Sequence, residues 1–308
     1  MSTKIRIALF GIIIITAIAT GCNSVHPIRL NYTMPPSQLA NMSWYEILTN
    51  PPKIDSFKVL NTGAVKVPLS GMLNIKKLKA ANADTLDKYL WVDVFVFLFH
   101  HKEKGWFMID TGLDSSFQNK GNIKGLMAGK FIKETRQQRG QNIAAQLKKE
   151  NKHIQGIFIT HLHGDHTSGL PELDRSLPKY VATGEEFHHI PMLYYSNHLT
   201  DQDQLFELDW TKGANKFPFP SVMDIFGDGS FLGIHTPGHS NNHLSYLLMT
   251  TQGAILLMGD ASHTKYGFKN KIEPGWVEDR AAAERSVEQL VKFHEMNPQV
   301  KVMYGHEQ

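Results

Sequence analysis

The sequence predicts an α/β or α+β fold in which two β-sheets are enclosed by helices. Short apolar runs that are typical of buried strands alternate with turns, and two helical patterns each lie between strands. The order strands, helix, strand occurs twice along the chain, which indicates two similar halves. The chain has 308 residues, enough for one large domain or two small ones, and its hydrophobic content of 42% allows a sizeable core.

The first predicted half extends from about Phe57 to Thr160. We expect strands at residues 64–69, 91–99, 105–109 and 154–160, and a helix at residues 142–150. The run 91–99 is apolar at nearly every position, which is typical of a strand covered on both faces. In the helix, Ile143 and Leu147 are four residues apart and therefore share one face.

The second predicted half contains strands at residues 231–235, 254–258 and 300–304, and a helix at residues 279–295. Val287, Leu290 and Val291 form an apolar stripe on that helix, and Pro298 follows its end. The stretch 180–220 is irregular and rich in aromatic residues. It is expected either to form an apolar lip for an acyl chain or to cover the edge of the sheets.

The N-terminus has the pattern of a secretory signal peptide over residues 1–22. Lys4 and Arg6 precede an apolar stretch at 7–18, and the small residues before Cys22 resemble a bacterial lipobox, in which the cysteine becomes lipidated. We therefore expect a lipid on Cys22 that anchors the chain to a membrane; an uncleaved anchor and plain secretion are the alternatives. Asn23 after the cysteine favours the outer membrane. The expected location is the bacterial cell envelope, as a periplasm-facing or outer-membrane-anchored lipoprotein.

Residues 23–52 contain five prolines and are predicted to form a tether with one short helix, so the folded domain is expected at 53–308. The formal charge is +3 without a long basic run, which argues against nucleic acid as a partner. Only one cysteine is present, so a zinc site built on cysteines is excluded. The 16 histidines are more than packing usually requires.

Three imidazoles and a carboxylate lie within six residues directly after the predicted strand 154–160. Side chains alternate along a strand, so His161 and His163 are expected on the same side. A tight turn at Gly164 then directs Asp165 and His166 towards a second position. This spacing predicts two adjacent metal ions, one bound by the first pair and one by the second.

Three further metal ligands are expected where other predicted strands end. His239 follows the strand ending at 235, Asp260 follows 254–258, and His306 follows the last strand. A glycine stands immediately before each of them, and glycine lets the backbone approach a metal closely.

These residues resemble the metallo-β-lactamase superfamily of metal-dependent hydrolases, from about Val59 to the C-terminus. The turn Asp110-Thr111-Gly112 is similar to a strand-end turn of that family. The resemblance implies an αββα sandwich of two mixed sheets flanked by helices, with a site for two divalent metal ions, zinc by default, at one edge of the sheets. It assigns one ion to His161, His163 and His239, the other to Asp165, His166 and His306, and a bridging role to Asp260.

Within the superfamily, the acyl-homoserine lactonases are the most similar members. The stretch 236–243, Asp260-Ala261-Ser262 and the ending Gly305-His306-Glu307 match their pattern. Cys22 cannot supply the cysteine ligand of common β-lactamases, and only 48 residues follow Asp260, too few for the helical domain of glyoxalase II. The lactonases carry a substrate-binding tyrosine three residues after the bridging aspartate. That position holds His263 here, so either His263 or Tyr266 is expected to take the catalytic role, unless it is lost.

The resemblance implies that a metal-bridging hydroxide opens a lactone or another carboxylic ester, with Asp165 shuttling a proton to the leaving group. The partner is therefore a small-molecule ester or lactone. The alternatives are hydrolysis of phosphodiesters or sulfate esters, β-lactam hydrolysis, and an inactive lipoprotein that only binds.

Three further residues or pairs have two interpretations each. His243 is expected to support the site by hydrogen bonding or to be a core histidine. Asp110 orients a ligand or caps its own turn. The pair His188-His189 is either a solvated helix face or a second metal pair.

Overall fold

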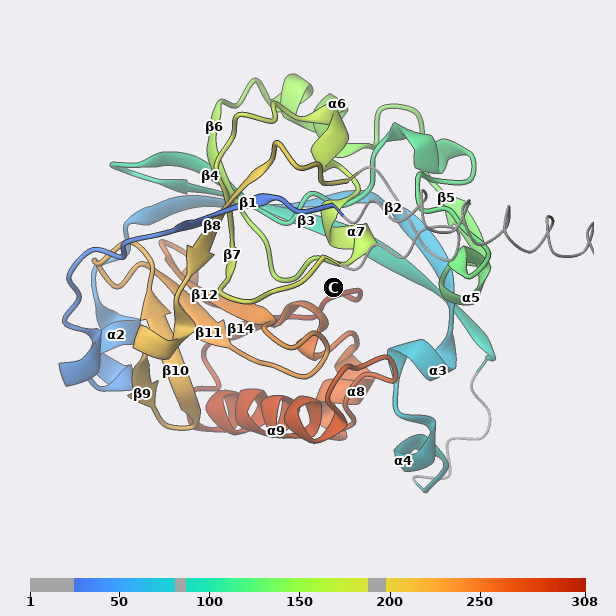
Figure 1. Cartoon of the computed structure of the whole chain (residues 1–308). Helices are drawn as coiled ribbons and strands as arrows, with labels where there is room; N and C mark the ends of the chain where they lie inside the picture. The colour runs from blue at the N-terminus through green and yellow to red at the C-terminus, as the bar shows by residue number, and fades with distance from the viewer. Residues whose placement is uncertain (1–24, 81–86, 188–197) are drawn as a thin grey trace, which may run out of the picture.

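The computed structural model describes residues 25–80, 87–187 and 198–308 (Figure 1). The predicted signal peptide with Cys22, and the pair His188-His189, lie outside these residues. Within the described part of the chain, no helix is long and apolar enough to span a bilayer.

The described strands form two halves of a mixed sheet that are joined where β12 meets β2. The first half has the order β1-β8-β7-β6-β4-β3-β2, with β5 beside β2. Its strands are β1 (Ile28–Asn31), β2 (Ile54–Pro68), β3 (Tyr89–His101), β4 (Gly105–Ile109), β5 (Glu134–Arg136), β6 (Ile154–Phe158), β7 (Lys179–Ala182) and β8 (Gln204–Leu208). Among the described strands, the register between β2 and β12 is a single pair, Ile54 with Thr250, and the two halves share a core between them.

The second half has the order β12-β11-β10-β9, with β13 and then β14 on the other side of β12. Its strands are β9 (Ala214–Lys216), β10 (Phe219–Asp224), β11 (Phe231–His235), β12 (Leu244–Thr250), β13 (Gly253–Leu257) and β14 (Lys301–Met303). The described α-helices are α2 (Trp44–Thr49), α3 (Leu69–Met72), α4 (Ile75–Ala80), α5 (Ala128–Phe131), α6 (Ile143–Glu150), α7 (Gly164–Thr167), α8 (Lys265–Lys269) and α9 (Arg280–Met296).

The hydrophobic cores show that these elements form four layers. Phe97 and Phe99 of β3 pack with Tyr246 and Leu248 of β12 between the two halves of the sheet. The alternate residues of β3, such as Leu98, instead pack against α6. Because neighbouring side chains of a strand point to opposite faces, β3 is buried on both sides, as its sequence predicted.

The second half is covered in the same way by α9, whose Val287, Leu290 and Val291 pack against Leu247 and Leu256. Figure 1 shows α6 and α9 on opposite outer sides of the strands. The layers are therefore helix, sheet, sheet, helix, which confirms the predicted sandwich. The N-terminus of α9 is capped by Asp279, whose side chain accepts a hydrogen bond from the backbone N–H of Ala282.

The segment predicted as a tether follows a different course in the structure. Strand β1 pairs in parallel with β8 at the sheet edge. The predicted short helix is present as α2, but Trp44 packs on Phe293 with ring centroids 4.8 Å apart, and Ile47 is fully buried. The prolines that suggested a tether are also compatible with an extended edge segment, and the apolar residues between them cover the core. Part of the segment before residue 53 therefore packs on the folded core.

Candidate metal centre

The histidine-rich turn connects β6 to α7. His161 and His163 follow β6, His163 has an extended backbone, and the two rings are 4.4 Å apart. Helix α7 begins at Gly164, so Asp165 and His166 occupy its first turn and point back towards the same region. A strand end followed directly by a helix therefore brings four donor side chains together.

The other three predicted ligands come from the ends of strands in the second half. His239 lies in the turn between β11 and β12, Asp260 in the short 3₁₀ turn after β13, and His306 after β14. Because β13 and β14 are parallel neighbours, Asp260 and His306 leave the sheet side by side. A Cβ atom on Gly305 would lie 2.6 Å from the carboxylate of Asp260, so this close approach requires glycine.

The seven side chains form two groups in which every donor atom lies within 4.8 Å of the others. These are the groups that the sequence spacing and the family resemblance predicted. The first contains His161, His163 and His239, and the second contains Asp165, His166, Asp260 and His306.

Asp260 lies between the two groups and presents one carboxylate oxygen to each. Its Oδ1 is 3.4 Å from Nε2 of His166 and 3.3 Å from Nε2 of His306. Its Oδ2 is 3.3 Å from Nε2 of His239 and 3.9 Å from Nε2 of His161. This is the arrangement expected of a carboxylate that bridges two cations.

Buried donor atoms without hydrogen-bond partners show that the residues fit a metal. Among the described residues, Nε2 of His161, Nε2 of His166 and Oδ1 of Asp260 are buried and have no such partner. Leaving buried polar atoms unsatisfied is costly, and a divalent cation placed between them would satisfy all three. Imidazole nitrogens combined with carboxylate oxygens suit zinc and related first-row ions.

Hydrogen bonds to the other ring nitrogen orient several of these histidines. Nδ1 of His239 lies 2.9 Å from the carbonyl oxygen of Trp276, and Nδ1 of His306 lies 2.8 Å from that of Asp93. A carbonyl oxygen only accepts, so each Nδ1 carries a proton, and Nε2 is the nitrogen that each ring presents to a metal. Backbone carbonyls have no side-chain signature, so neither of these contacts was predictable from the sequence.

Asp110 and His243 support the site in the way that the sequence suggested. The carboxylate of Asp110 is 2.8 Å from Nδ1 of His166 and also accepts the backbone N–H of Thr160, so the orienting role is confirmed. Nε2 of His243 accepts the backbone N–H of Asp260 at 3.0 Å, which confirms its supporting role.

The electrostatics of the cluster favour cation binding. Burial lowers the pKa of His161 and of His239 well below the usual value, so both rings are neutral and able to coordinate. Burial alone would also lower the pKa of His306, but the negative charge of Asp260 outweighs it and raises the pKa to about 9. In the absence of a metal, His306 therefore holds a proton that a cation would displace.

The sequence analysis did not identify Glu185, which joins the two loops that carry ligands. Its buried carboxylate accepts the backbone N–H of Leu162, at 3.1 Å, and the hydroxyl of Ser240, at 2.9 Å. Leu162 lies between two metal ligands and Ser240 follows a third. Burial raises the pKa of Glu185 to about 7. A glutamate in an irregular loop gives no pattern that would have distinguished it from a surface acid.

Comparison with known proteins agrees with this geometry. The family model of the metallo-β-lactamase superfamily matches residues 89–306, which is more than half of the chain and includes all seven donors. The chain belongs to the metallo-β-lactamase superfamily. The protein is a metal-dependent hydrolase. Its cluster of histidines and aspartates supports the use of divalent metal ions.

Its relatives include several lactonases. An N-acyl homoserine lactonase from a Bacillus species is 29% identical over 67% of this chain and 78% of the relative. The N-acyl homoserine lactonase AttM from Agrobacterium fabrum is 26% identical over 50% of this chain and only 58% of its own length. The solved structure of an N-acyl homoserine lactone hydrolase with N-hexanoyl-L-homoserine at its catalytic metal centre has a TM-score of 0.65 and 23% identity, covering 83% of this chain and 94% of that one.

In this protein, a cavity of about 290 Å³ opens beside the donor atoms of the metal cluster. Its polar side is formed by side chains of the metal cluster. Its other side is apolar and comes from β2, β3, the segment around α5 and the loop before α9. The apolar lining residues are Val65, Val67, Met72, Val92, Ile123, Met127, Phe131, Ile132 and Trp276. The rings of Phe131 and Trp276 meet edge to face at 5.2 Å, which joins two parts of this wall.

Of the two residues considered for the tyrosine's place, the structure brings only His263 to the cluster. His263 is buried, lines the cavity, and forms a third potential donor group with His239 and Asp260. Tyr266 lies on α8 with 37% of its surface exposed and is not among the described residues that line the cavity. The proposal for Tyr266 is therefore not supported by its position.

The aromatic stretch 180–220 contributes strands to the sheet in its described part, namely β7, β8, β9 and the start of β10. Tyr180 stacks on Phe158 at 4.6 Å, and Trp210 stacks on His235 at 3.9 Å. None of its described residues lines the cavity at the cluster. The expectation of an irregular segment is therefore wrong for these residues, and the wall that an acyl chain would contact comes from elsewhere.

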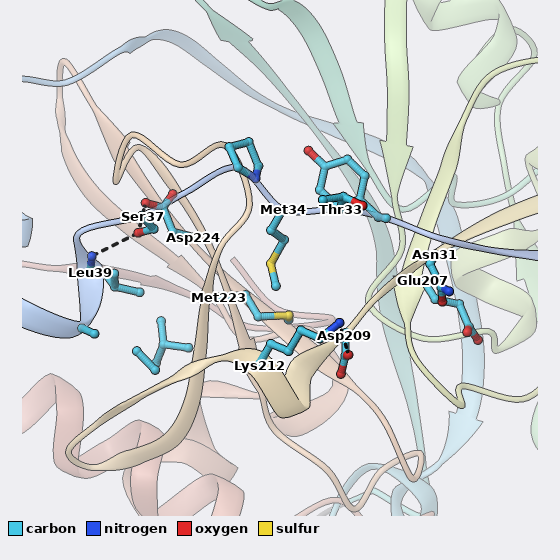
Figure 2. Close-up of a pocket in the computed structure, with 15 residues that line it drawn as sticks. Asn31, Thr33, Met34, Ser37, Leu39, Glu207, Asp209, Lys212, Met223 and Asp224 are labelled. Carbon is cyan, nitrogen blue, oxygen red and sulfur yellow. Dashed lines mark hydrogen bonds and ion pairs between the residues drawn. The ribbon is translucent and has the colours of Figure 1, made fainter.

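A larger cavity, of about 660 Å³, lies between the N-terminal segment, β8 and β10 (Figure 2). Its acidic side chains are already paired. Glu207 bonds to Arg29 and Asp209 to Lys212, and Asp224 accepts the hydroxyl of Ser37. These carboxylates are satisfied by the protein, unlike the donor atoms of the metal cluster.

Proposed function

We propose that the chain is a dinuclear metal-dependent hydrolase that opens lactones or other carboxylic esters bearing an apolar group. The position of Asp260 supports two cations, because each of its oxygens faces a separate set of imidazoles. Several relatives are named as N-acyl homoserine lactonases. A lactone that carries an acyl chain also suits the cavity beside the cluster.

Two cations bound there would polarise the carbonyl oxygen and supply a water of lowered pKa. The chain's own residues would position the substrate around them. The apolar wall with Met72, Phe131 and Trp276 binds the hydrocarbon part and excludes water. Asp165 lines the cavity and is only half-buried, so its carboxylate can accept a proton from the attacking water and pass it to the leaving alkoxide.

The composition of the cavity wall carries this proposal. Among the described residues, no lysine or arginine lines the cavity, whereas nine apolar side chains do. Phosphodiester and sulfate-ester substrates bring a permanent negative charge, which protein sites usually meet with arginine or lysine. A neutral ester or lactone with a hydrocarbon chain matches the wall better, so the phosphodiester alternative is the second candidate.

The test compares the wild-type protein with Asp260→Asn, and uses Asp224→Asn as the control. Both substitutions replace a buried carboxylate, but Asp224 lies beside the larger cavity and bonds to Ser37 and nearby backbone N–H groups. We would measure bound metal and turnover of a long-chain homoserine lactone, an aryl ester, a bis-aryl phosphodiester and a cephalosporin.

We expect two metal ions per chain and lactone turnover in the wild type and in Asp224→Asn. Asp260→Asn should lose metal and reduce turnover by at least about 100-fold. Phosphodiester turnover exceeding lactone turnover would replace the proposal with its alternative. Full lactone turnover by Asp260→Asn would contradict the bridging role.

A further inference from the structure

A basic segment lies next to the apolar wall of the metal-site cavity. Residues 120–139 carry six lysines and arginines and one acidic residue. This excess of positive charge is greater than the net charge of +3 of the entire chain. All six basic side chains are exposed: Lys120, Lys124, Lys130, Lys133, Arg136 and Arg139. We name residues 120–139 the basic lip.

The single acidic residue of the basic lip, Glu134, forms an ion pair with a lysine outside the segment. Glu134 pairs with Lys66 of β2 at 2.6 Å. Arg136 is held with its guanidinium 4.0 Å from the ring of Trp91 on β3, so its charge stays beside an aromatic surface. No other acidic residue within the segment balances the positive charge of the basic lip. The guanidinium of Arg136 is held in place by its contact with Trp91.

The basic lip also exposes apolar surface. Leu126 is 82% exposed and lies in sequence between Lys124 and Lys130. A second small cavity, of about 280 Å³, is lined by Ile123 and Ile132 together with Lys120 and Lys133. Apolar groups beside lysines, with tyrosine and tryptophan at the margin, are typical of surfaces that contact the headgroup region of a bilayer.

We infer that the basic lip docks on an anionic phospholipid surface. Charge complementarity supports this partner, because lysines and arginines near such a surface are attracted by its phosphates. Leu126 would enter the headgroup region, and Tyr89 and Trp91 at the edge of the lip would lie at the level of the headgroups. The lipid expected on Cys22 would hold the chain at a membrane in any case, and the basic lip determines which face is turned towards it.

The docking has a geometric consequence for the metal centre. Ile123, Met127, Phe131 and Ile132 of the basic lip also line the cavity beside the cluster. Figure 1 shows α5 and β5 at the end of the molecule opposite to α2. A bilayer bound there would face the apolar side of the cavity, so amphiphilic substrates dissolved in the membrane would have a short path to the site.

The experiment measures sedimentation with vesicles, using the chain from residue 22 onward with Cys22→Ala in every sample, so that neither the apolar stretch 7–18 nor an attached lipid contributes. Vesicles of phosphatidylcholine are compared with vesicles that also contain one-third phosphatidylglycerol, at low and high salt. The test variant is Lys120→Gln/Lys124→Gln/Lys130→Gln. The control is Lys148→Gln/Lys149→Gln/Lys292→Gln, which removes the same charge from exposed positions on α6 and α9. Thermal unfolding and metal content verify that all variants are folded.

We expect binding that depends on phosphatidylglycerol and weakens with salt. The test variant should lose about 100-fold in this affinity and the control should lose little. Leu126→Ser should weaken binding about 10-fold while leaving its salt dependence unchanged. Equal binding to both vesicle types, equal losses in test and control variants, no salt-sensitive binding, or equally strong binding to duplex DNA would each overturn the inference.

Discussion

Nε2 of His263 lies 2.9 Å from Oδ2 of Asp260, the oxygen that faces the first donor group. The other ring nitrogen, Nδ1, is 3.2 Å from the carbonyl oxygen of Met72. The Met72 carbonyl and the Asp260 carboxylate can both only accept hydrogen bonds, so both ring nitrogens donate, and the N–H of Nε2 is the one directed towards the cavity. His263 therefore stands between the bridging carboxylate and the space that a substrate would fill.

We predict that His263→Ala reduces kcat/KM for a lactone about 100-fold while the metal content is retained. The reason is that removing a donor which binds the developing oxyanion usually costs this much. His263→Tyr should recover part of the activity, because the similar lactonases carry tyrosine at this place. Steady-state kinetics and metal analysis on both variants check the prediction. Loss of metal from His263→Ala would instead identify His263 as a ligand.

Asp110 provides a second prediction, because its carboxylate orients His166 rather than binding metal itself. In Asp110→Asn the amide nitrogen would face a ring N–H or the N–H of Thr160, and one of these hydrogen bonds is lost. We expect metal affinity at the second position to fall about 10- to 100-fold. Competition with a chelator measures this.

The matched control is Asp114→Asn, four residues further along the same loop. Asp114 is also buried, but its carboxylate bonds to Ser116 and Asn122. Equal loss of metal in both variants would show that the loop is simply destabilised and that Asp110 has no specific orienting role.

The sequence indicated which donor side chains the structure brings together, because they follow strand ends. The strands β6 and β13 before His161 and Asp260 are short and mostly buried, and β14 before His306 lies in parallel beside β13. Local patterns were therefore sufficient to locate the donors. The period of two along a strand predicted that His161 and His163 lie together, whereas the grouping of His239, His306 and Asp260 with them came from the family resemblance.

The remaining features depend on contacts between distant segments. The cavity wall combines Met72, Phe131 and Trp276, which are separated by long stretches of sequence and share no motif. The N-terminal segment was predicted as a tether from its prolines, although Trp44 and Ile47 are core residues. Such packing depends on tertiary structure and not on any local pattern. Exposed side chains such as Tyr266 also cannot be distinguished from site residues by spacing alone.

Metal removal gives a third prediction, which concerns stability. Without cations, the buried donors of His161, His166 and Asp260 have no partners, and this destabilises the fold. We expect a chelator to lower the thermal unfolding midpoint and added zinc to restore it, by about 2.7 kcal/mol for each site at 100 times its dissociation constant. Differential scanning calorimetry measures the shift. Asp260→Asn should show little response, and an equal response would place the stabilising metal elsewhere.

The last prediction concerns His198, a buried histidine that is not among the predicted ligands but contacts the helix that carries two of them. Its Nε2 bonds to Oδ1 of Asn122 at 2.6 Å, and its Nδ1 lies 3.0 Å from the hydroxyl of Thr167. Burial lowers its pKa to about 3, whereas an unfolded chain has a histidine pKa of about 6.5. Between these values the unfolded state binds the additional proton. The stability that the neutral ring contributes is therefore complete above pH 6.5 and is lost as the pH falls towards 3.

At pH 5 this loss amounts to about 2 kcal/mol in the free energy of unfolding relative to pH 7.5. We expect His198→Gln to be less stable than the wild type at pH 7.5, but to lose about 2 kcal/mol less on acidification, because glutamine does not titrate. Urea unfolding of the metal-free protein at both pH values measures the difference. The exposed His153→Gln serves as the control and should follow the wild type. If His198→Gln and the wild type lose equal stability, the ring of His198 accepts its proton without unfolding.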